Sequence, residues 1–449
     1  MKTCIRWMSI IAGLTLSLSS GAFAKSENSV TVINPQSLRT ILLSQNIDIA
    51  VALNQVQQAK THVSQARASL LPSVNLGSVI SSGPSFMLTS VSFLMPFLMP
   101  SKWMDLKEST HLLKAQGISY YLAQLNGYAS AYSLYMTVLG DMELRNALYS
   151  QYENFKAIED QLRLPAEVGI IRKEDFLQAQ AQAELALVQV SQVDELIVRE
   201  TAAIRQMLGL SLNQKIVFAP ATTAASNYEN WNPQTLLDKI HSSSPETQQM
   251  DSLLLAAEYA KWSKTFGFLS GASLGVNRPI TGGSFSSVTS SSNVNFGFGY
   301  FPALELSNQN LAQLRLRKQE VRLEQAQLIE SALGAMVEAH KQYNSAVQAE
   351  ANLRTVYDAE YMRYQVGIVD IVQVLQAGNS LTTAVVNKVK AQTNLNTLRI
   401  SLHRMTGDDQ FKAIEKCVIE RRSSGGIKGR LGRIFQPGKD RVTIDQVCG

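Results

Sequence analysis

One spacing recurs along this chain of 449 residues. The segment PAEVGIIRKEDFLQA at 165–179 is similar to RYQVGIVDIVQVLQA at 363–377, and their central glycines are 198 positions apart (169 to 367). Four further pairs of residues keep the same offset: Leu38 and Leu236, Asn46 and Ser244, Leu71 and Leu269, Gly209 and Gly407. Five matched pairs at one offset indicate a tandem duplication of about 200 residues. The function must therefore be one that two copies of such a unit can build.

The apolar pattern predicts the same series of elements in both copies. Apolar residues recur at helical spacing in a first helix (35–71 and 233–266), a long helix (101–164 and 303–363) and a returning helix (173–208 and 369–407). A helix of about 60 residues extends about 90 Å, several times the usual length in a globular domain. The chain divides into a signal peptide (1–24), a first repeat (25–212), a linker (213–232), a second repeat (233–407) and a basic C-terminal tail (408–449).

Between the first and long helices, each copy is predicted to form two strands. Residues 73–100 contain no acidic or basic side chain and have a Ser-Gly-Pro-Ser turn at 82–85. In the second copy, residues 293–300 alternate Asn or Gly with Val, Phe or Tyr. Small and polar residues that alternate with aromatic ones are typical of membrane β-barrel strands. The edge of a soluble β-sandwich would show the same alternation, but the attached 90 Å helices favour the barrel.

The N-terminus indicates export. Lys2 and Arg6 precede an apolar run that is too short to cross a bilayer as a helix, and Ala22-Phe23-Ala24 fits a signal-peptidase site. Removal of these 24 residues takes the formal net charge from +5 to +3, which does not suggest a nucleic-acid partner. An oxidising compartment favours a disulfide between the two remaining cysteines, Cys417 and Cys448, with two free thiols as the alternative.

No pattern in the sequence predicts an enzyme, a cofactor or a metal site. The five histidines are scattered without metal-ligand spacing: His62, His111, His241, His340 and His403. The segment Gly271–Gly275 matches the G-x-S-x-G pattern of esterases, which requires a turn from a strand into a helix. Here the segment lies within an alternating strand, so we interpret the match as fortuitous.

The repeat constrains the assembly. Two copies supply only four strands, and a small barrel needs about eight or more. Open strand edges are not tolerated in lipid, so the chain must oligomerise, and three chains would supply twelve strands. The same closed symmetry would gather the long helices into one hollow cylinder. The predicted fold class is therefore an α+β membrane protein, a tandem-duplicated protomer with four β-strands and long coiled-coil α-helices. Three protomers would form a 12-stranded β-barrel continued by an α-helical barrel.

With these elements in this order, residues 35–407 resemble the TolC family of outer-membrane channels. The resemblance is carried by the paired Val-Gly-Ile turns, Leu71-Pro72 before the strands, Ser101-Lys102-Trp103 after them, Met207-Leu208-Gly209 at the end of the first copy, and the duplication itself. It implies a homotrimer in the outer membrane of a Gram-negative bacterium, extending into the periplasm. It also implies that the helix tips dock a periplasmic adaptor (membrane fusion) protein of an inner-membrane transporter. The chain would then be the exit duct of a tripartite efflux pump or a type I secretion system.

The resemblance also implies roles for individual residues. The adaptor-docking tips would be Val168, Gly169, Ile170, Val366, Gly367 and Ile368, and the periplasmic pore mouth would hold Tyr364, Asp175, Gln373 and Gln376. The chain departs from the family pattern at several of these places. Val369 stands where an arginine is expected, and Gln373 and Gln376 stand where the pore mouth would carry two aspartates. Pro165 is expected to kink the end of the long helix.

Two other classes of protein compete with the duct. A periplasmic coiled-coil structural tether without a pore would explain the long helices, but not strands of barrel type placed identically in both copies. A stand-alone porin would explain the strands but not the helices. The sequence does not identify the cargo, because selectivity in such systems belongs to the pump.

Overall fold

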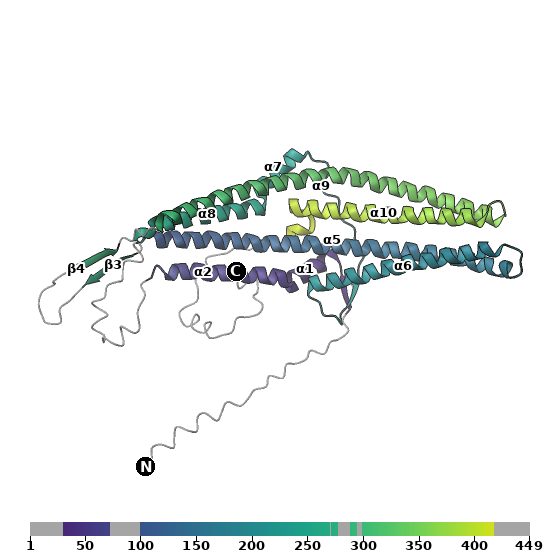
Figure 1. Cartoon of the computed structure of the whole chain (residues 1–449), viewed down its shortest axis with the longest axis horizontal. Coiled ribbons are helices and arrows are strands. Elements are labelled where there is room, and N and C mark those ends of the chain that lie inside the picture. Colours follow the sequence, from purple (N-terminus) through teal and green to yellow (C-terminus); the bar gives the residue numbers. More distant parts are fainter. Residues whose placement is uncertain (1–29, 72–98, 270, 277–287, 294–298, 417–449) are drawn as a thin grey trace, which may run out of the picture.

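We describe a computed structural model of the chain, which covers residues 30–71, 99–269, 271–276, 288–293 and 299–416. Two helices span almost the whole length of the molecule (Figure 1): α5 (Pro100–Glu167), with 68 residues, and α9 (Tyr300–Gln365), with 66. Each extends about 100 Å at 1.5 Å per residue. These are the long helices expected at 101–164 and 303–363, and both are confirmed. None of the helices in the described ranges is long and apolar enough to cross a membrane.

The shorter helices run beside the long ones. Along one side of α5 lie α2 (Ile47–Ala68) and α6 (Lys173–Leu208), and along its other side lie α8 (Pro245–Thr265) and α10 (Ile371–Thr406). The helix α9 packs against α8 and α10 and forms one edge of the layer. Figure 1 shows that α8 and α10 follow one another along the layer, as do α2 and α6. Each repeat thus places two shorter helices, one before and one after its long helix in the sequence, beside that long helix.

The expected single helices over 35–71 and 233–266 were wrong, because each is broken near its middle. The first divides at Asn46 into α1 (Pro35–Gln45) and α2, and the second divides at Ser244 into α7 (Pro233–Ser243) and α8. Both residues have extended backbones, with ψ of 132° and 127°, and both side chains accept a hydrogen bond from the backbone N–H three residues later. Asn and Ser compete with helix continuation in this way, and their N-cap geometry starts the second helix.

The duplication is visible in the geometry of the matched positions. Asn46 and Ser244 form the same kind of break, and Leu38 and Leu236 are both completely buried. Gly209 and Gly407 end α6 and α10 with φ of 64° and 69°, the left-handed conformation typical of helix C-termini. At Gly209 a side chain would also clash, because a Cβ there would lie 2.8 Å from the carbonyl oxygen of Gln45.

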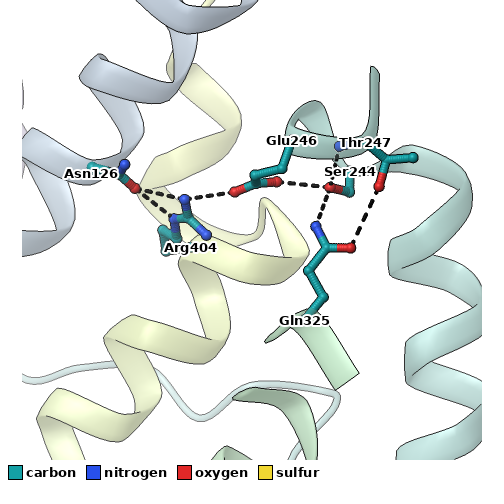
Figure 2. Close-up of polar contacts among 6 residues, drawn as sticks. All are labelled: Asn126, Ser244, Glu246, Thr247, Gln325 and Arg404. Carbon is teal, nitrogen blue, oxygen red and sulfur yellow. Dashed lines mark hydrogen bonds and ion pairs between the residues drawn. The ribbon is translucent and has the colours of Figure 1, made fainter. Parts of the chain in front are cut away.

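Polar contacts hold the place where α10 ends and α8 begins (Figure 2). The guanidinium of Arg404 donates to the side-chain amide oxygen of Asn126 on α5 at 2.6 and 3.0 Å and pairs with Glu246 of α8 at 2.7 Å. The hydroxyl of Ser244 donates to Glu246 and accepts from Gln325 of α9. This junction therefore joins four helices. In the first repeat the corresponding contact is simpler: the Asn46 side-chain amide donates to the Met207 carbonyl at 2.7 Å.

The segments between the helices pack against the middle of α5. The strand β1 (Val30–Ile33) pairs in parallel with β2 (Lys215–Phe218), which lies within the segment 213–232 expected to be only a linker. A short 3-10 helix, η3 (Asp409–Ala413), buries Phe411 against Tyr128 of α5. The first residues of the expected basic tail (408–449) are therefore folded, whereas residues 417–449, with Cys417 and Cys448, lie outside the described residues.

The described strands of the second copy lie at one end of the long helices. The strand β3 (Gly271–Val276) pairs antiparallel with β4 (Val288–Asn293), and Gly271 lies opposite Asn293. The G-x-S-x-G match falls within β3, as expected for a fortuitous match. The strand expected over 293–300 was wrong at its end, because Tyr300 is the first residue of α9. The strand pair expected at 73–100 falls almost entirely on residues outside the described ranges, as does the signal peptide (1–24).

Candidate functional site

Two turns reverse the chain at the end of the helices opposite to β3 and β4 (Figure 1). The turn after α5 has Gly169 at φ 78°, and the turn after α9 has Gly367 at φ 73°. In both, the N–H of the following isoleucine donates at 2.9 Å to the carbonyl five residues earlier, from Ile170 to Pro165 and from Ile368 to Arg363. This pattern, with glycine in the left-handed region, is a Schellman motif. The sequence placed both turns correctly.

Pro165 lies within the last turn of α5. The helix continues through it to Glu167. The carbonyl of Pro165 accepts the closing hydrogen bond of the turn from Ile170. The proline removes one late N–H donor of α5 without ending the helix before the turn, and the expected kink stays a prediction.

The residues at the tips of both turns are exposed and apolar. Val168 and Ile170 are 61% and 77% exposed, and Val366 and Ile368 are 69% and 72% exposed. A Cβ added at Gly169 or Gly367 would have no heavy atom within 4 Å. Aliphatic groups held outward on a rigid turn are suited to burial against another protein, since exposed apolar patches commonly mark interaction sites. The described structure therefore has two equivalent exposed apolar surfaces at one end of the molecule.

Packing behind the turns keeps them rigid. Phe155 and Leu162 of α5, Ala183 of α6, and Val374 and Leu375 of α10 are buried together in one cluster. Gly378 of α10 lets the two repeats approach closely, because a Cβ there would lie 2.8 Å from the ring of Phe155. The turns of the two repeats thus share one core.

An ion pair joins the N-termini of the two returning helices. Arg172, the N-cap residue of α6, lies 3.3 Å from Asp370, the N-cap residue of α10, and 3.4 Å from Asp175. Arg172 and Asp370 are 198 positions apart, so they are equivalent residues of the two copies. Further along the same two helices, the Asn379 side-chain amide donates to Gln182 at 3.1 Å. The pairing of Arg172 with Asp370 was not predicted from the sequence. The one signal for it was that these two residues of opposite charge occupy equivalent positions in the two repeats.

Tyr364 and Asp175, both expected at a pore mouth, lie near one another. Tyr364 is half-buried in the cluster behind the turns, and burial raises the pKa of its phenol, with further contributions from the Asp175 and Asp370 carboxylates. Arg172 partly balances these two acids. The structure therefore brings a tyrosine, two carboxylates and an arginine together beneath the turns.

Gln373 and Gln376 lie apart from this charged group. Both are exposed on α10, while Val374, Leu375 and Ala377 between and beside them are buried. Residues three apart share a helix face, so the two amides form one neutral polar strip.

Chemistry of other kinds has little support in the described part of the chain. No group of three or more His, Cys, Asp or Glu side chains is placed there to hold a metal ion. Two histidines instead tie the segment 219–232 to the helices: the His340 imidazole lies 3.0 Å from Glu229, and that of His403 lies 2.9 Å from the Ala224 carbonyl oxygen.

Comparison with known proteins gives matches at the level of structure. No protein-family model matches the chain, and no curated protein sequence matches it. The CmeC outer membrane channel of Campylobacter jejuni is similar over 85% of this chain and 88% of its own, with a TM-score of 0.69 and 18% identity. VceC, an outer membrane protein of Vibrio cholerae, is similar over 83% of this chain and 96% of its own, with a TM-score of 0.65 and 14% identity. The MtrE outer membrane channel of Neisseria gonorrhoeae is similar over 83% and 88%, with a TM-score of 0.61 and 14% identity.

The chain has the fold of the TolC-type outer-membrane channels. The resemblance found in the sequence is thus confirmed for the fold. The TolC-type fold is mostly long helix in the described residues, with few and short strands. Identities of 14–18% establish the fold alone, so the roles of the turns and of the residues beneath them rest on the chain's own geometry.

Proposed function

We propose that this chain is the outer-membrane exit duct of a tripartite efflux pump or of a type I secretion system. One observation carries the proposal: a chain with the TolC-type fold exposes two equivalent Val-Gly-Ile turns at the end of its helices farthest from its strands. In an outer-membrane channel that end would project about 100 Å into the periplasm. The turns would there meet a periplasmic adaptor protein, which links the duct to an inner-membrane transporter. The proposal requires no cofactor, no enzymatic activity and no nucleic acid.

The outermost helices of the layer favour assembly with further copies. On α6, Leu185 and Val198 are 55% and 68% exposed, and on α9, Leu316 and Leu323 are 66% and 72% exposed. Apolar side chains spread along both outer helices are suited to burial against a neighbour. The sequence predicts four barrel strands for each chain, two in each repeat. Three chains would then close a barrel of twelve strands, an even and closable number. We therefore propose a homotrimer, with its strands in outer-membrane lipid and its helices as a periplasmic tunnel.

The division of the chain follows from this assembly. We propose that residues 1–24 are removed on export and that 25–212 and 233–407 form equivalent repeats. The segment 213–232 would clasp the middle of the tunnel, because Glu229 binds Arg399 at 3.0 Å and the strand β2 pairs with β1. Residues 408–449 would begin as part of this clasp, since Phe411 is buried beside Tyr128.

The proposal is tested by isolating outer membranes from cells that express the chain. A barrel-bearing trimer is expected to migrate differently on a gel when unboiled, and the purified trimer is expected to conduct ions in planar bilayers. The periplasmic fraction is the control for leakage. A chain found in the periplasm, without a heat-modifiable form and without conductance, would instead be the coiled-coil tether.

A further inference from the structure

A cavity of about 540 Å³ lies at the end of the helices next to the strands. Its lining comes from three helices of one chain: Arg67 near the end of α2, Trp103 and Lys107 near the start of α5, and Tyr259 near the end of α8. Residues 72–98 join α2 to α5, and β3 follows α8 after a short 3-10 helix (Phe266–Leu269). The cavity therefore lies where the helical part of the chain meets the part predicted to enter the membrane.

Aromatic rings and basic groups alternate around this cavity. The His111 imidazole stacks on the Tyr259 ring with centroids 5.3 Å apart, and the Lys107 ammonium lies 5.1 Å from the centroid of the same ring. Trp103 is 37% exposed at its rim. The Nδ1 atom of His111 is buried and has no hydrogen-bond partner among the described residues. The site thus holds a buried polar atom that its own chain leaves unsatisfied, which native structures rarely do.

The charges at this end of α5 are separated by face. Among the described residues, no carboxylate lines the cavity and no ion pair involves Arg67 or Lys107. Two acidic residues nearby are not part of the lining: Asp105 accepts a hydrogen bond from Ser263, and burial followed by the Asp105 charge raises the pKa of Glu108. The pKa of His111 is lowered by burial and then by Lys114 and Lys107. The two charged side chains in the lining, Arg67 and Lys107, are therefore both basic.

The cavity opens on the outer face of the helical layer. Thr110 in its lining and Tyr128 are 18 residues apart, which is five turns of an α-helix, so both lie on one face of α5. Tyr128 packs on Phe411 and donates to the carbonyl of Pro35. In the proposed trimer, the segments that cover Tyr128 would fill the tunnel if they lay on its inner face, so this face would be the outside. A group at the surrounding membrane surface can therefore reach the cavity.

We propose that this cavity binds the phosphate of an anionic phospholipid in the periplasmic leaflet of the outer membrane. The inference rests on the proposed function, since it places the strand end of the helices at that leaflet. Trp and Tyr are enriched at membrane interfaces, where their rings lie at headgroup level, and long basic side chains extend to lipid phosphates. Arg67 and Lys107 would contact the phosphate oxygens, and His111 would supply a hydrogen bond from its ring. A zwitterionic lipid would bind less tightly, because its amine would find no carboxylate in the lining.

The test compares the trimeric protein with the double variant Arg67→Gln and Lys107→Gln. Native mass spectrometry in detergent would follow the binding of added phosphatidylglycerol, phosphatidylethanolamine and diacylglycerol. Each basic residue near an anionic lipid surface contributes about five-fold in affinity, so the variant is expected to bind phosphatidylglycerol about 25-fold more weakly. Phosphatidylethanolamine is expected to bind the unmodified trimer more weakly than phosphatidylglycerol, and diacylglycerol, which lacks the phosphate, more weakly still.

A matched control removes two positive charges elsewhere. Arg199→Gln with Lys390→Gln changes exposed residues of α6 and α10 and is expected to leave lipid binding unchanged. Equal binding of phosphatidylglycerol before and after the Arg67 and Lys107 substitutions, in trimers that conduct, overturns the lipid site alone. Equal binding of diacylglycerol or phosphatidylethanolamine overturns the recognition of an anionic phosphate. An unmodified protein that forms neither trimers nor channels overturns the proposed function and the lipid site with it.

Discussion

A pair of carboxylates between α5 and α6 should make the stability of the protein depend on pH. Asp141 and Glu200 share a hydrogen bond, and the Glu200 Oε2 atom is buried without a partner among the described residues. Burial, then the charge of Asp141 and their hydrogen bond, raises the pKa of Glu200 to about 7. An ordinary glutamate has a pKa of about 4.5, so the folded protein holds this proton more tightly than the unfolded chain does.

The sign and size of the effect follow from that difference. Below pH 4.5 Glu200 is protonated in both the folded and the unfolded chain, so it does not change the free energy of unfolding. Between pH 4.5 and about 7 it ionises in the unfolded chain but stays protonated in the folded protein, and the folded state loses stability as the pH rises. The full difference would correspond to about 3 kcal/mol at about 1.4 kcal/mol for each pKa unit. Because the side chain is only partly buried, solvent screening reduces the expected penalty to about 1–2 kcal/mol. The free energy of unfolding should fall by that amount between pH 4.5 and 7.

The substitution Glu200→Gln removes the ionisation while keeping the shape of the side chain. At pH 8 it should raise the free energy of unfolding by about 1–2 kcal/mol, and at pH 4.5 it should have little effect. Denaturant titrations followed by helical circular dichroism at the two pH values measure this. Glu184→Gln, sixteen residues earlier on the same helix and exposed, is the matched control and should change neither value. An effect of Glu200→Gln that is equal at both pH values, or destabilising at pH 8, would refute the reasoning.

Three further outcomes are expected from the tips and the core behind them. Gly169→Pro and Gly367→Pro should abolish export but keep the trimer and its conductance, because proline cannot adopt the positive φ of these turns; loss of the trimer would contradict this. The neutral strip of Gln373 and Gln376 should give weak cation selectivity and little block by divalent cations in planar bilayers, and changing both to Asp should create such block. Gly378→Ala should destabilise the fold by about 1–3 kcal/mol in denaturant titrations, because the new methyl group would overlap a phenyl ring of α5.

The Gly378→Ala prediction has a control variant, and the last two predictions each have a result that would contradict them. Gly334→Ala on α9 meets no heavy atom within 4 Å, so it should be neutral or stabilise the helix by up to about 1 kcal/mol. Cation block of the unmodified channel at micromolar levels would show that another acidic ring lies at the mouth. A Gly378→Ala protein as stable as the Gly334→Ala protein would show that α10 and α5 are packed less closely than described.

The sequence predicted the elements whose signal is periodic and long. The long helices and both turns are confirmed, because 60 or more residues of regular apolar spacing leave few alternatives and the glycines mark the reversals. The breaks at Asn46 and Ser244 were missed, since the apolar pattern continues across them and one capping side chain decides the matter. Both positions had nevertheless been matched by the repeat offset.

Features that depend on distant contacts were beyond the sequence. The strand β2 has four residues and pairs with β1, which lies more than 180 positions earlier (30 to 215), so no local pattern indicated it. The pairing of Arg172 with Asp370 required the two repeats to be placed side by side. The docking role of the turns and the pore-mouth role of Gln373 and Gln376 stay predictions, because they concern partners and symmetry that a single chain does not contain.

The distance from the strands to the turns is set by several helices together, because shorter helices lie end to end beside each long one. In the first repeat α2 and α6 have 22 and 36 residues beside the 68 of α5, and in the second α8 and α10 have 21 and 36 beside the 66 of α9. An insertion in α5 alone would displace its turn by about 1.5 Å per residue, so that this turn would project beyond the turn that follows α9. The turns stay level only if all four helices on that side of the junctions lengthen together. Proteins of this fold with longer or shorter helices should therefore differ by matched insertions of whole heptads, which also keep the packing register.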